Sequence, residues 1–273
     1  MNEQNQNSLN EEYDAKMTRK YEGKIKNGKL EIGHWNCGDL EVTNLLFLEN
    51  FDIQTLLLNI SIKMSVKLRS NTLKELSVFH YRDQEEDDDD DDDDDVQKQR
   101  LNLNVDDLEL ENLEVLDLTD NKLVNDQIIN LAKFKKLHTL DVSRNDVDLT
   151  HIHSVTSLTK LNMTECGLQN IDLISSLVNL EELDISLNRN VDLSQLWQVR
   201  SLTKLSVRQC GLTNIDQITQ LINLEVLNVA DNQRLTINSI GSLVNLKELN
   251  ICQNRCLDIT PLKDLVGHKI IPQ

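Results

Sequence analysis

Cysteine thiols are the most reactive groups that this sequence offers, and their spacing fits neither a zinc site nor a redox pair. The chain has five cysteines. Cys252 and Cys256 lie four positions apart, and no second pair of cysteines completes a tetrahedral zinc site. An odd number of cysteines without an export signal indicates free thiols in a reducing compartment. We therefore expect no metal site at the cysteines.

Histidines and short catalytic motifs point to no reaction either. His151 and His153 are separated by one residue, with no carboxylate or cysteine at ligand spacing beside them. The sequence contains no glycine-rich phosphate loop, no G-x-S-x-G nucleophile elbow and no cysteine–histidine pair at a plausible site. It therefore predicts a protein that is not an enzyme and that has no catalytic, cofactor-binding or metal-binding residues.

The strongest charge feature is an acidic run from Glu85 to Asp95. The chain carries 28 Lys plus Arg and 46 Asp plus Glu, a formal charge of −18, and the run supplies eleven of the negative charges. It lacks the glycine turn and the alternating ligand spacing of a calcium-binding EF-hand. Two interpretations stay open: a solvated low-complexity insertion, or a segment that binds basic proteins such as histone tails.

Charge and hydropathy also exclude several classes of partner. A negatively charged surface gains nothing from a polyanion, so we expect no nucleic acid. No apolar stretch reaches the roughly 18 residues of a transmembrane helix, so we expect no membrane partner. The first twelve residues have neither a basic end nor an apolar block. We therefore expect no signal peptide, and a cytoplasmic or nuclear protein.

The elements that would position these residues come from an internal repeat. The segment Ser157–Leu161 recurs 44 residues later as Ser201–Leu205, and an ungapped alignment of 157–200 on 201–244 gives 18 identities. A related copy lies between them. The first leucine of the pattern recurs at steps of 24, 21, 22, 22, 22 and 22 residues, at Leu113, Leu137, Leu158, Leu180, Leu202, Leu224 and Leu246. Such a period predicts a stack of similar structural units.

Each copy reads L-x-x-L-x-Φ-x-x-N/C, where Φ is apolar. Alternation at the fourth and sixth places, as in Leu161 and Met163, predicts a short strand with one face inward. Asparagine at the ninth place can bond the backbone that leaves the strand, and Cys166 and Cys210 substitute for it. These two thiols would lie about 10 Å apart, beyond the reach of a disulfide. Later apolar residues at three-residue spacing predict 3₁₀ turns or a short helix on the returning side.

These copies resemble leucine-rich repeats, and most of all the 22-residue class typified by a regulatory subunit of protein phosphatase 1. The clear resemblance covers 113–260, and weaker copies at Leu73–Val78 and Ile53–Leu58 extend it upstream, with Lys29–Ile32 as a first strand. The resemblance implies an α/β fold, a curved solenoid with a parallel β-sheet on its concave face and 3₁₀ or short helical turns on its convex face. It also implies docking onto a phosphatase catalytic subunit as one alternative function.

Composition divides the chain into three predicted segments. Residues 1–12 are polar, and we expect them to be disordered. Residues 13–52 concentrate most of the aromatic residues, and we expect them to form an N-terminal cap and the first turn. Residues 53–273 are predicted to form the leucine-rich repeats, with an acidic loop insertion at 83–100 that adds about one turn's worth of sequence.

Side chains at the third, fifth and seventh places of each copy are predicted to point away from the core, onto the concave face. The third place alternates in charge, so its residues either neutralise one another across adjacent strands or bind a partner. The fifth and seventh places are small and polar, and only Arg208 is of a type enriched in binding hot spots. The predicted partner-binding residues are Asp141, Ser143, Lys160, Asn162, Thr164, Glu182, Asp184, Ser186, Lys204, Ser206, Arg208, Asn228 and Asn250.

Together these features predict a monomeric, non-enzymatic scaffold that binds a protein partner on the concave face, without cofactor or metal. Two alternatives remain beside it. The resemblance implies a regulatory subunit of a protein phosphatase 1-type enzyme, and the acidic run of residues 85–95 indicates a binder of basic proteins such as histones. The sequence does not identify the partner, because the repeat is defined by core residues and specificity by surface residues.

Overall fold

The computed structural model describes residues 25–32, 42–44, 51–60, 65–80, 103–255, 257–264 and 269–271. The chain forms two compact units, which we call the first unit, Met1–Leu137, and the second unit, His138–Gln273. The predicted disordered segment 1–12 and the predicted acidic insertion 83–100 lie outside the described residues, as does most of the predicted cap at 13–52. These segment boundaries stay predictions from the sequence.

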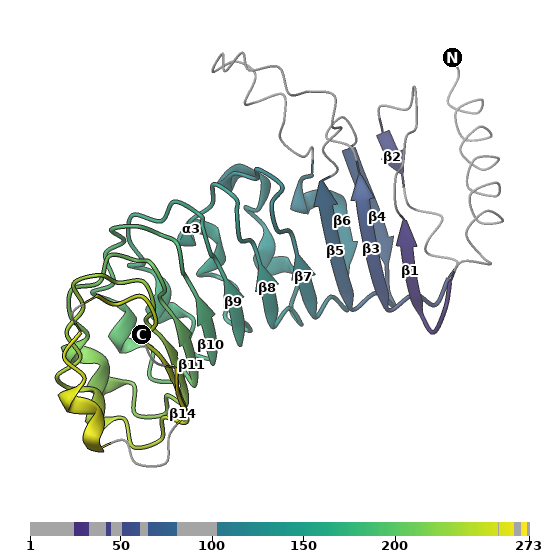
Figure 1. Ribbon diagram of the computed structural model, residues 1–273. Coiled ribbons are helices and arrows are strands. Elements are labelled where there is room, and N and C mark those ends of the chain that lie inside the picture. Colours follow the sequence, from purple (N-terminus) through teal and green to yellow (C-terminus); the bar gives the residue numbers. More distant parts are fainter. Residues whose placement is uncertain are drawn as a thin grey trace, which may run out of the picture. The chain divides into compact units, whose positions relative to one another are not determined.

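Parallel strands form one sheet of the first unit, at the places where the sequence predicts weaker repeat copies (Figure 1). Their pairing brings Leu30, Leu56, Leu76 and Leu116 into one row, and all four side chains have 0% exposure. This row of leucines is the core that holds the strands in register, because each side chain packs against the next turn. In order of pairing, the strands are β1 (Lys29–Ile32), β3 (Thr55–Ile60), β5 (Glu75–His80) and β7 (Val115–Asp117).

The returning side of the first unit contains strands where the sequence analysis expects 3₁₀ turns. β2 (Val42–Asn44), β4 (Ser65–Ser70) and β6 (Leu108–Leu110) form a second parallel sheet. Alternation is the reason: Leu68 and Ser70 of β4 are buried, Lys67 and Arg69 are exposed, and this period of two fits a strand. This unit also contains three short 3₁₀ helices among its described residues, η2 (Val105–Asp107) directly before β6, η3 (Asn125–Gln127) and η4 (Leu131–Lys133).

In the second unit each repeat copy contributes one short strand, and each strand pairs in parallel with the next. In every strand of this unit but the last, the middle residue is a buried leucine, so Leu161, Leu183 and Leu205 lie side by side in the core. The strands are β8 (Thr139–Asp141), β9 (Lys160–Asn162), β10 (Glu182–Asp184), β11 (Lys204–Ser206), β12 (Val226–Asn228), β13 (Glu248–Asn250) and β14 (Lys269–Ile271).

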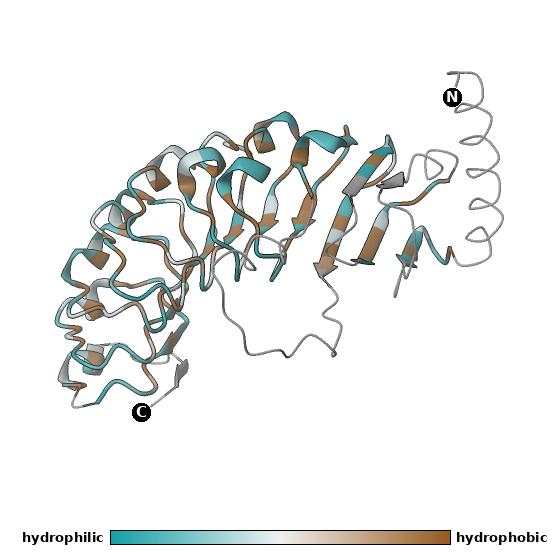
Figure 2. Ribbon diagram, turned by 90° about the horizontal axis from the view of Figure 1, so that it is seen from above, coloured by the Kyte–Doolittle hydropathy of each residue, from teal (hydrophilic) through white to brown (hydrophobic). Residues whose placement is uncertain are grey.

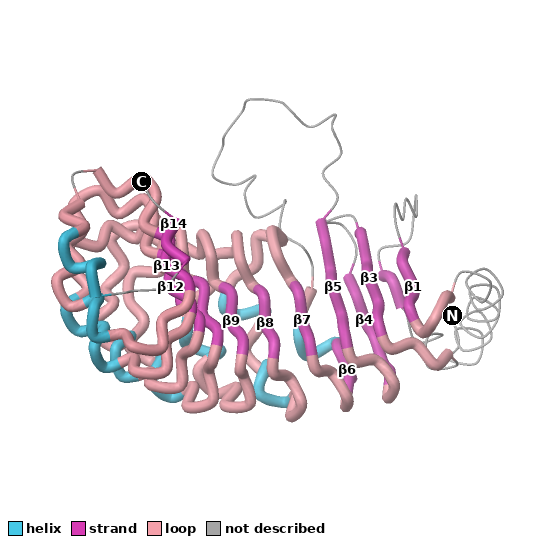
Figure 3. Tube along the Cα trace, turned by 60° about the horizontal axis from the view of Figure 1, so that its bottom comes forward, coloured by secondary structure: helices cyan, strands magenta, loops and turns pink. Residues whose placement is uncertain are grey.

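The returning side of the second unit consists of short helices, each one turn of the repeat apart (Figure 3). This confirms the predicted repeat architecture of a parallel sheet on one side and 3₁₀ or short helical turns on the other. All of these helices except the last bury one or two apolar residues each, such as Ile174, Leu196 and Ile218. They are α3 (Leu149–Ile152), η5 (Ile174–Ser176), η6 (Leu196–Gln198), η7 (Asp216–Gln220), η8 (Ile240–Ser242) and η9 (Thr260–Asp264).

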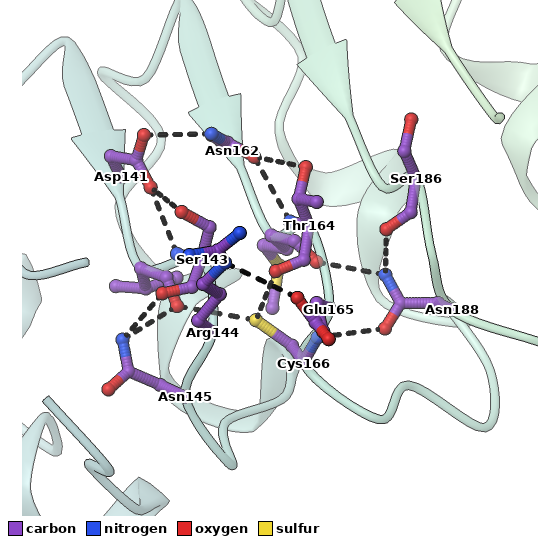
Figure 4. Close-up of polar contacts among 12 residues, drawn as sticks. Asp141, Ser143, Arg144, Asn145, Asn162, Thr164, Glu165, Cys166, Ser186 and Asn188 are labelled. Atoms are coloured by element: carbon purple, nitrogen blue, oxygen red, sulfur yellow. Dashed lines mark hydrogen bonds and ion pairs between the residues drawn. The ribbon is translucent and has the colours of Figure 1, made fainter. Parts of the chain in front are cut away.

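A ladder of buried asparagines runs through the second unit at the ninth repeat place (Figure 4). Asn188 Nδ2 donates to the carbonyl of Met163 at 2.9 Å and to that of Ile185 at 2.8 Å. Its Oδ1 accepts from the backbone N–H groups of Cys166 and Leu168, each at 3.0 Å. The amide therefore ties its own turn to the preceding one, which is the role that the sequence predicts for it.

The chain leaves each strand through a residue in the left-handed conformation at the eighth repeat place. None of these residues is glycine, although φ lies between 54° and 64°, at Asp120, Arg144, Glu165, Leu187, Gln209, Asp231 and Gln253. Leu187, with φ 64°, has no polar group that could bond locally to support this conformation, which costs about 1 kcal/mol. Each turn therefore places one side chain beside the end of its strand. This side chain is polar in every copy named except that of Leu187.

Apolar and polar residues alternate along the ribbon (Figure 2), and the buried core is mostly leucine, isoleucine and valine. The buried polar residues that the structure describes are serines and asparagines, and none is charged. The charged residues therefore lie on outward surfaces, where they are available to a partner. Among the helices that the structure describes, none has the length and apolar character needed to cross a bilayer.

Candidate functional site

The outward side of strands β8 to β12 carries a polar surface with a shallow hollow of about 320 Å³. Each strand alternates, so the central leucine points into the core while its two neighbours point outward. Eight of the predicted partner-binding residues line this hollow, and we call them the strand-face strip: Asp141, Lys160, Asn162, Glu182, Asp184, Lys204, Ser206 and Asn228. The structure brings these residues together, and their role in binding stays a prediction.

Glu182 lies at the centre of the strand-face strip, between two lysines on the adjacent strands. Its Oε1 is 3.2 Å from Lys160 Nζ and 2.8 Å from Lys204 Nζ. Burial alone would raise the pKa of Glu182, but hydrogen bonds from the two lysines outweigh it and hold this pKa below its usual range. The same contact raises the pKa of Lys204. The expected charge neutralisation is therefore present, and these three side chains together keep one positive charge.

The fifth-place side chains of the strip also support the turn that follows each strand. Asp141 Oδ1 accepts from the backbone N–H of Ser143 at 2.9 Å and from its hydroxyl at 2.6 Å. Asp184 Oδ1 accepts from the backbone N–H of Ser186 at 2.9 Å. Bonds to the residue two positions further on are typical of Asx turns. The same bond is made by Asn162, Asn228 and Asn250.

The seventh place is less open than the sequence analysis expects. Ser143 and Ser186 are each only 6% exposed. The Asx turn is the reason at Ser143, because the fifth-place carboxylate bonds its hydroxyl, while the hydroxyl of Ser186 lies 2.8 Å from that of Ser206. Thr164 is half-buried, and Arg208 is exposed. Arg208 is therefore the seventh-place residue best placed to reach a partner. Of the other predicted residues, Asn250 is half-buried in β13 and lies outside the residues that line the hollow.

Two cysteines replace asparagine in the buried ladder and take over part of its bonding. Cys166 Sγ donates to the carbonyl of Val142 at 3.3 Å, and Cys210 Sγ donates to that of Ile185 at the same distance. Burial raises the pKa of each thiol to about 12, the opposite of the lowered pKa that makes a cysteine reactive. Both thiols are free, so the interpretation as substituted ladder positions is confirmed.

The remaining candidates for chemistry have structural contacts. His153 Nδ1 lies 3.0 Å from the carbonyl oxygen of Leu149, one turn earlier in α3, and His151 is half-buried in the same helix. Within the described ranges, no three His, Cys, Asp or Glu residues lie close enough together to hold a metal ion. Cys256 lies outside the described residues.

A hollow of about 620 Å³ lies in the first unit, beside β4, β6 and η4. Arg69 and Glu109 form an ion pair at 2.5 Å across the two strands, and this contact lowers the pKa of Glu109. Lys133 Nζ donates to the carbonyl of Val105 at 2.6 Å, and burial lowers the pKa of this lysine. The first contact ties β4 to β6, and the second ties η4 to η2. None of the described side chains that line the hollow pairs a nucleophile with a base.

A second row of amides was not anticipated from the sequence. Asn179 Nδ2 donates to the carbonyl of Thr156, one turn earlier, at 2.9 Å. Asn223 and Asn245 repeat this contact two and three copies later along the same row, at 3.0 and 2.8 Å. The signal was present, because asparagine recurs directly before the first leucine of several copies. This row stabilises the turns that enter β10, β12 and β13, so these three strands are held at both ends.

Several solved structures are similar to this chain, whereas no family model and no curated protein matches the sequence. An internalin C2 of Listeria monocytogenes is similar over 59% of this chain and 71% of its own, with 25% identity and a TM-score of 0.52. A second internalin of that bacterium, InlF, matches over 83% and 77%, with 20% identity and a TM-score of 0.45. A plant peptide hormone receptor, RGFR1, in complex with RGF2 matches over 52% and 29%, with 20% identity and a TM-score of 0.39. The first of these supports the fold.

Proposed function

We propose that this leucine-rich repeat protein is a non-enzymatic scaffold that binds a protein partner on the strand-face strip. The observation that carries the proposal is the strip itself, a row of outward polar side chains on consecutive strands around an open hollow of about 320 Å³. Buried leucines and two rows of amides fix these strands. Binding would therefore order little of the chain, which keeps its entropic cost low.

The charges of the strip indicate the kind of surface that would fit it. Lys160 and Lys204 are exposed and share Glu182 between them. Asp141 and Asp184 lie on the fifth-place row next to them. Positive and negative groups therefore alternate within a short distance, and burial of these charges would have to be compensated by opposite charges on the partner. A polar protein surface of mixed charge satisfies this requirement, whereas an apolar helix does not.

A substitution experiment on captured partners tests this proposal. The full chain is used as bait, the bound proteins are identified by mass spectrometry, and recovery is compared with that of a variant carrying Lys160→Ala, Asp184→Ala, Arg208→Ala and Asn228→Ala. These changes remove charged and amide groups from the strip and its edge without touching the buried leucines. We expect the variant to lose the partner, because the charges of the partner would be buried without the opposite charges that these substitutions remove.

The matched control changes four exposed residues of similar types outside the strip, Asp172→Ala, Gln198→Ala, Arg200→Ala and Lys247→Ala. This variant should recover the partner as the unchanged chain does. If the strip variant recovers the partner equally well, the binding surface lies elsewhere on the chain and the proposal is wrong.

Regulation of a phosphatase is a second candidate, and it is supported by the 22-residue step of the repeat. In this case the partner on the strip would be a phosphatase catalytic subunit. A direct assay of such a subunit with and without the full chain decides the question: absence of both binding and a rate change removes this candidate. The histone-binding alternative depends on the run Glu85–Asp95, which lies outside the described residues, so it stays a prediction from the sequence.

A further inference from the structure

A second hollow of the second unit, of about 390 Å³, lies where the chain leaves strands β10, β11 and β12. We call it the arginine cleft, because its lining includes Arg189, Gln209, Gly211, Leu212, Asp231 and Arg234. These residues come from three successive turns. The cleft is separate from the strand-face strip, since the two hollows share no lining residue.

Two guanidinium groups in the arginine cleft lack an acidic partner. Over the part of the chain that the structure describes, Arg189 and Arg234 form no ion pair. Two other arginines of this unit do have such partners: Arg144 lies 3.3 Å from Glu165, and Arg208 lies 3.6 Å from Asp231. Both cleft arginines are exposed, so they are accessible to a ligand.

Asp231, which also lines the cleft, does not neutralise these two arginines. Its Oδ2 lies 3.6 Å from a guanidinium nitrogen of Arg208. Gln209 stands between Asp231 and Arg189: in the orientation that satisfies both neighbours, its amide nitrogen donates to Asp231 Oδ2 at 3.2 Å and its oxygen accepts from Arg189 at 2.7 Å. Gln209 thus orients Arg189 without cancelling its charge. Asp231 and Arg208 offset each other, so the cleft keeps two positive charges in a chain of net charge −18.

The walls of the cleft are rigid. The backbone N–H groups of Cys210 and Leu212 both donate to Asn232 Oδ1, at 3.1 and 3.0 Å. The backbone N–H of Asn190 donates to the carbonyl of Cys210 at 3.1 Å, which ties two adjacent walls together. Gly211 has φ +77°, and a Cβ atom there would lie 3.3 Å from Asn190 Oδ1. Glycine therefore allows the close approach of the two loops, and the cleft is formed before a ligand arrives.

We propose that the arginine cleft binds carboxylate groups of an acidic peptide segment, supplied by the protein partner that the proposed function assumes. The planar guanidinium fork matches a carboxylate in two parallel hydrogen bonds, and two forks in one hollow suit a segment with two acidic side chains. Half-buried Leu212 gives the segment an apolar contact beside the charges. Salt screens electrostatic attraction beyond about 8 Å, so the two arginines attract only acidic groups that lie in or beside the cleft. A short acidic segment therefore fits better than a long polyanion.

A peptide-binding assay tests this inference. A fluorescent hexaglutamate peptide is titrated with the full chain at low salt and followed by anisotropy, with hexaglutamine as the neutral control. We expect the glutamate peptide alone to bind. Arg189→Gln with Arg234→Gln should weaken binding about tenfold, because two ion pairs are lost. Arg200→Gln with Lys247→Gln removes the same charge from exposed positions outside the cleft and should change binding less than about twofold.

Three results would overturn the inference. Equal weakening by the two double variants would show a general charge effect, and unchanged binding by the cleft variant would place the site elsewhere. If a peptide with phosphoserine in place of glutamate bound more tightly than hexaglutamate, the cleft would be assigned to phosphate groups instead of carboxylates. Circular dichroism checks that the cleft variant folds. Arg189→Lys with Arg234→Lys provides a second test, because it keeps the charge and removes the fork, and it should still weaken binding.

The peptide-binding assay and the partner-recovery experiment can refute the inference and the proposed function separately. Lys160→Ala with Lys204→Ala changes the strand-face strip and no residue that lines the cleft. We expect this variant to bind the glutamate peptide as the unchanged chain does. Retained partner recovery by the strip variant would remove the proposed function while the peptide result stands. If the strip variant loses the partner while the cleft variant binds the glutamate peptide as the unchanged chain does, only the inference about the acidic segment is removed.

Discussion

Replacing Asn188 with alanine is expected to destabilise the second unit by about 3 kcal/mol. Asn188 is 1% exposed, and its side chain bonds two backbone N–H groups of the preceding turn and carbonyls of both turns. Alanine removes all of these bonds. It leaves buried backbone groups of Cys166 and Leu168 without this acceptor, and each unpaired group costs about 1 to 3 kcal/mol.

Urea unfolding of the full chain, followed by far-ultraviolet circular dichroism, measures this effect. Asn179→Ala is the matched control, because Asn179 is exposed and its side chain donates one hydrogen bond, to the carbonyl of Thr156 at 2.9 Å. We expect the control to lose less than about 1 kcal/mol. Asn188→Cys should recover part of the loss, since Cys166 and Cys210 show that a thiol can donate to the preceding turn. A loss from Asn188→Ala no larger than that of the control would refute the bonding role of the ladder.

Three further predictions concern stability, pH and thiol reactivity. Leu187→Gly should raise the unfolding free energy by about 1 kcal/mol, since glycine adopts the left-handed conformation of Leu187 without strain; a lower urea midpoint would contradict this. The pKa of Glu182 is lowered from 4.5 in the fold, so its ionised form stabilises the protein above that pH, and this stabilisation is lost as pH falls through the folded pKa. The stability difference between the unchanged chain and Glu182→Gln should therefore shrink in acid, and a difference independent of pH would exclude the contribution. Iodoacetamide at mildly alkaline pH should modify half-buried Cys252 before Cys166 and Cys210, whose pKa is about 12; peptide mass spectrometry showing equal rates would contradict their burial.

Much of the second unit follows from the sequence because its physics is local and repeated. A leucine every 22 residues must pack against its counterparts, and the asparagine at the ninth place of most copies must bond the backbone around it. Asn188 does so, and the thiols of Cys166 and Cys210 occupy the same place with part of the same bonding. The outward row of Lys160, Glu182 and Lys204 follows directly from the strand period.

Other features depend on geometry that the period does not contain. The strand β4 on the returning side of the first unit rests on a local alternation at Leu68 and Ser70, which the longer period masks. The burial of Ser143 requires an Asx turn, whose bonds depend on the backbone conformation after the strand. Arg189 and Arg234 stand at different places of their copies, so they form no row in the sequence. The folded loops bring both to one cleft.

A photo-crosslinking measurement tests the binding role of the strand-face strip most directly. A photoreactive amino acid replaces Asp184, at the middle of the strip, in one sample and Val178, which is 66% exposed and outside the residues that line the strip, in another. After irradiation in extract from the source cell, we expect Asp184 to give a covalent adduct with one defined protein and Val178 to give none. An adduct from Val178 with no adduct from Asp184 would contradict binding on the strip.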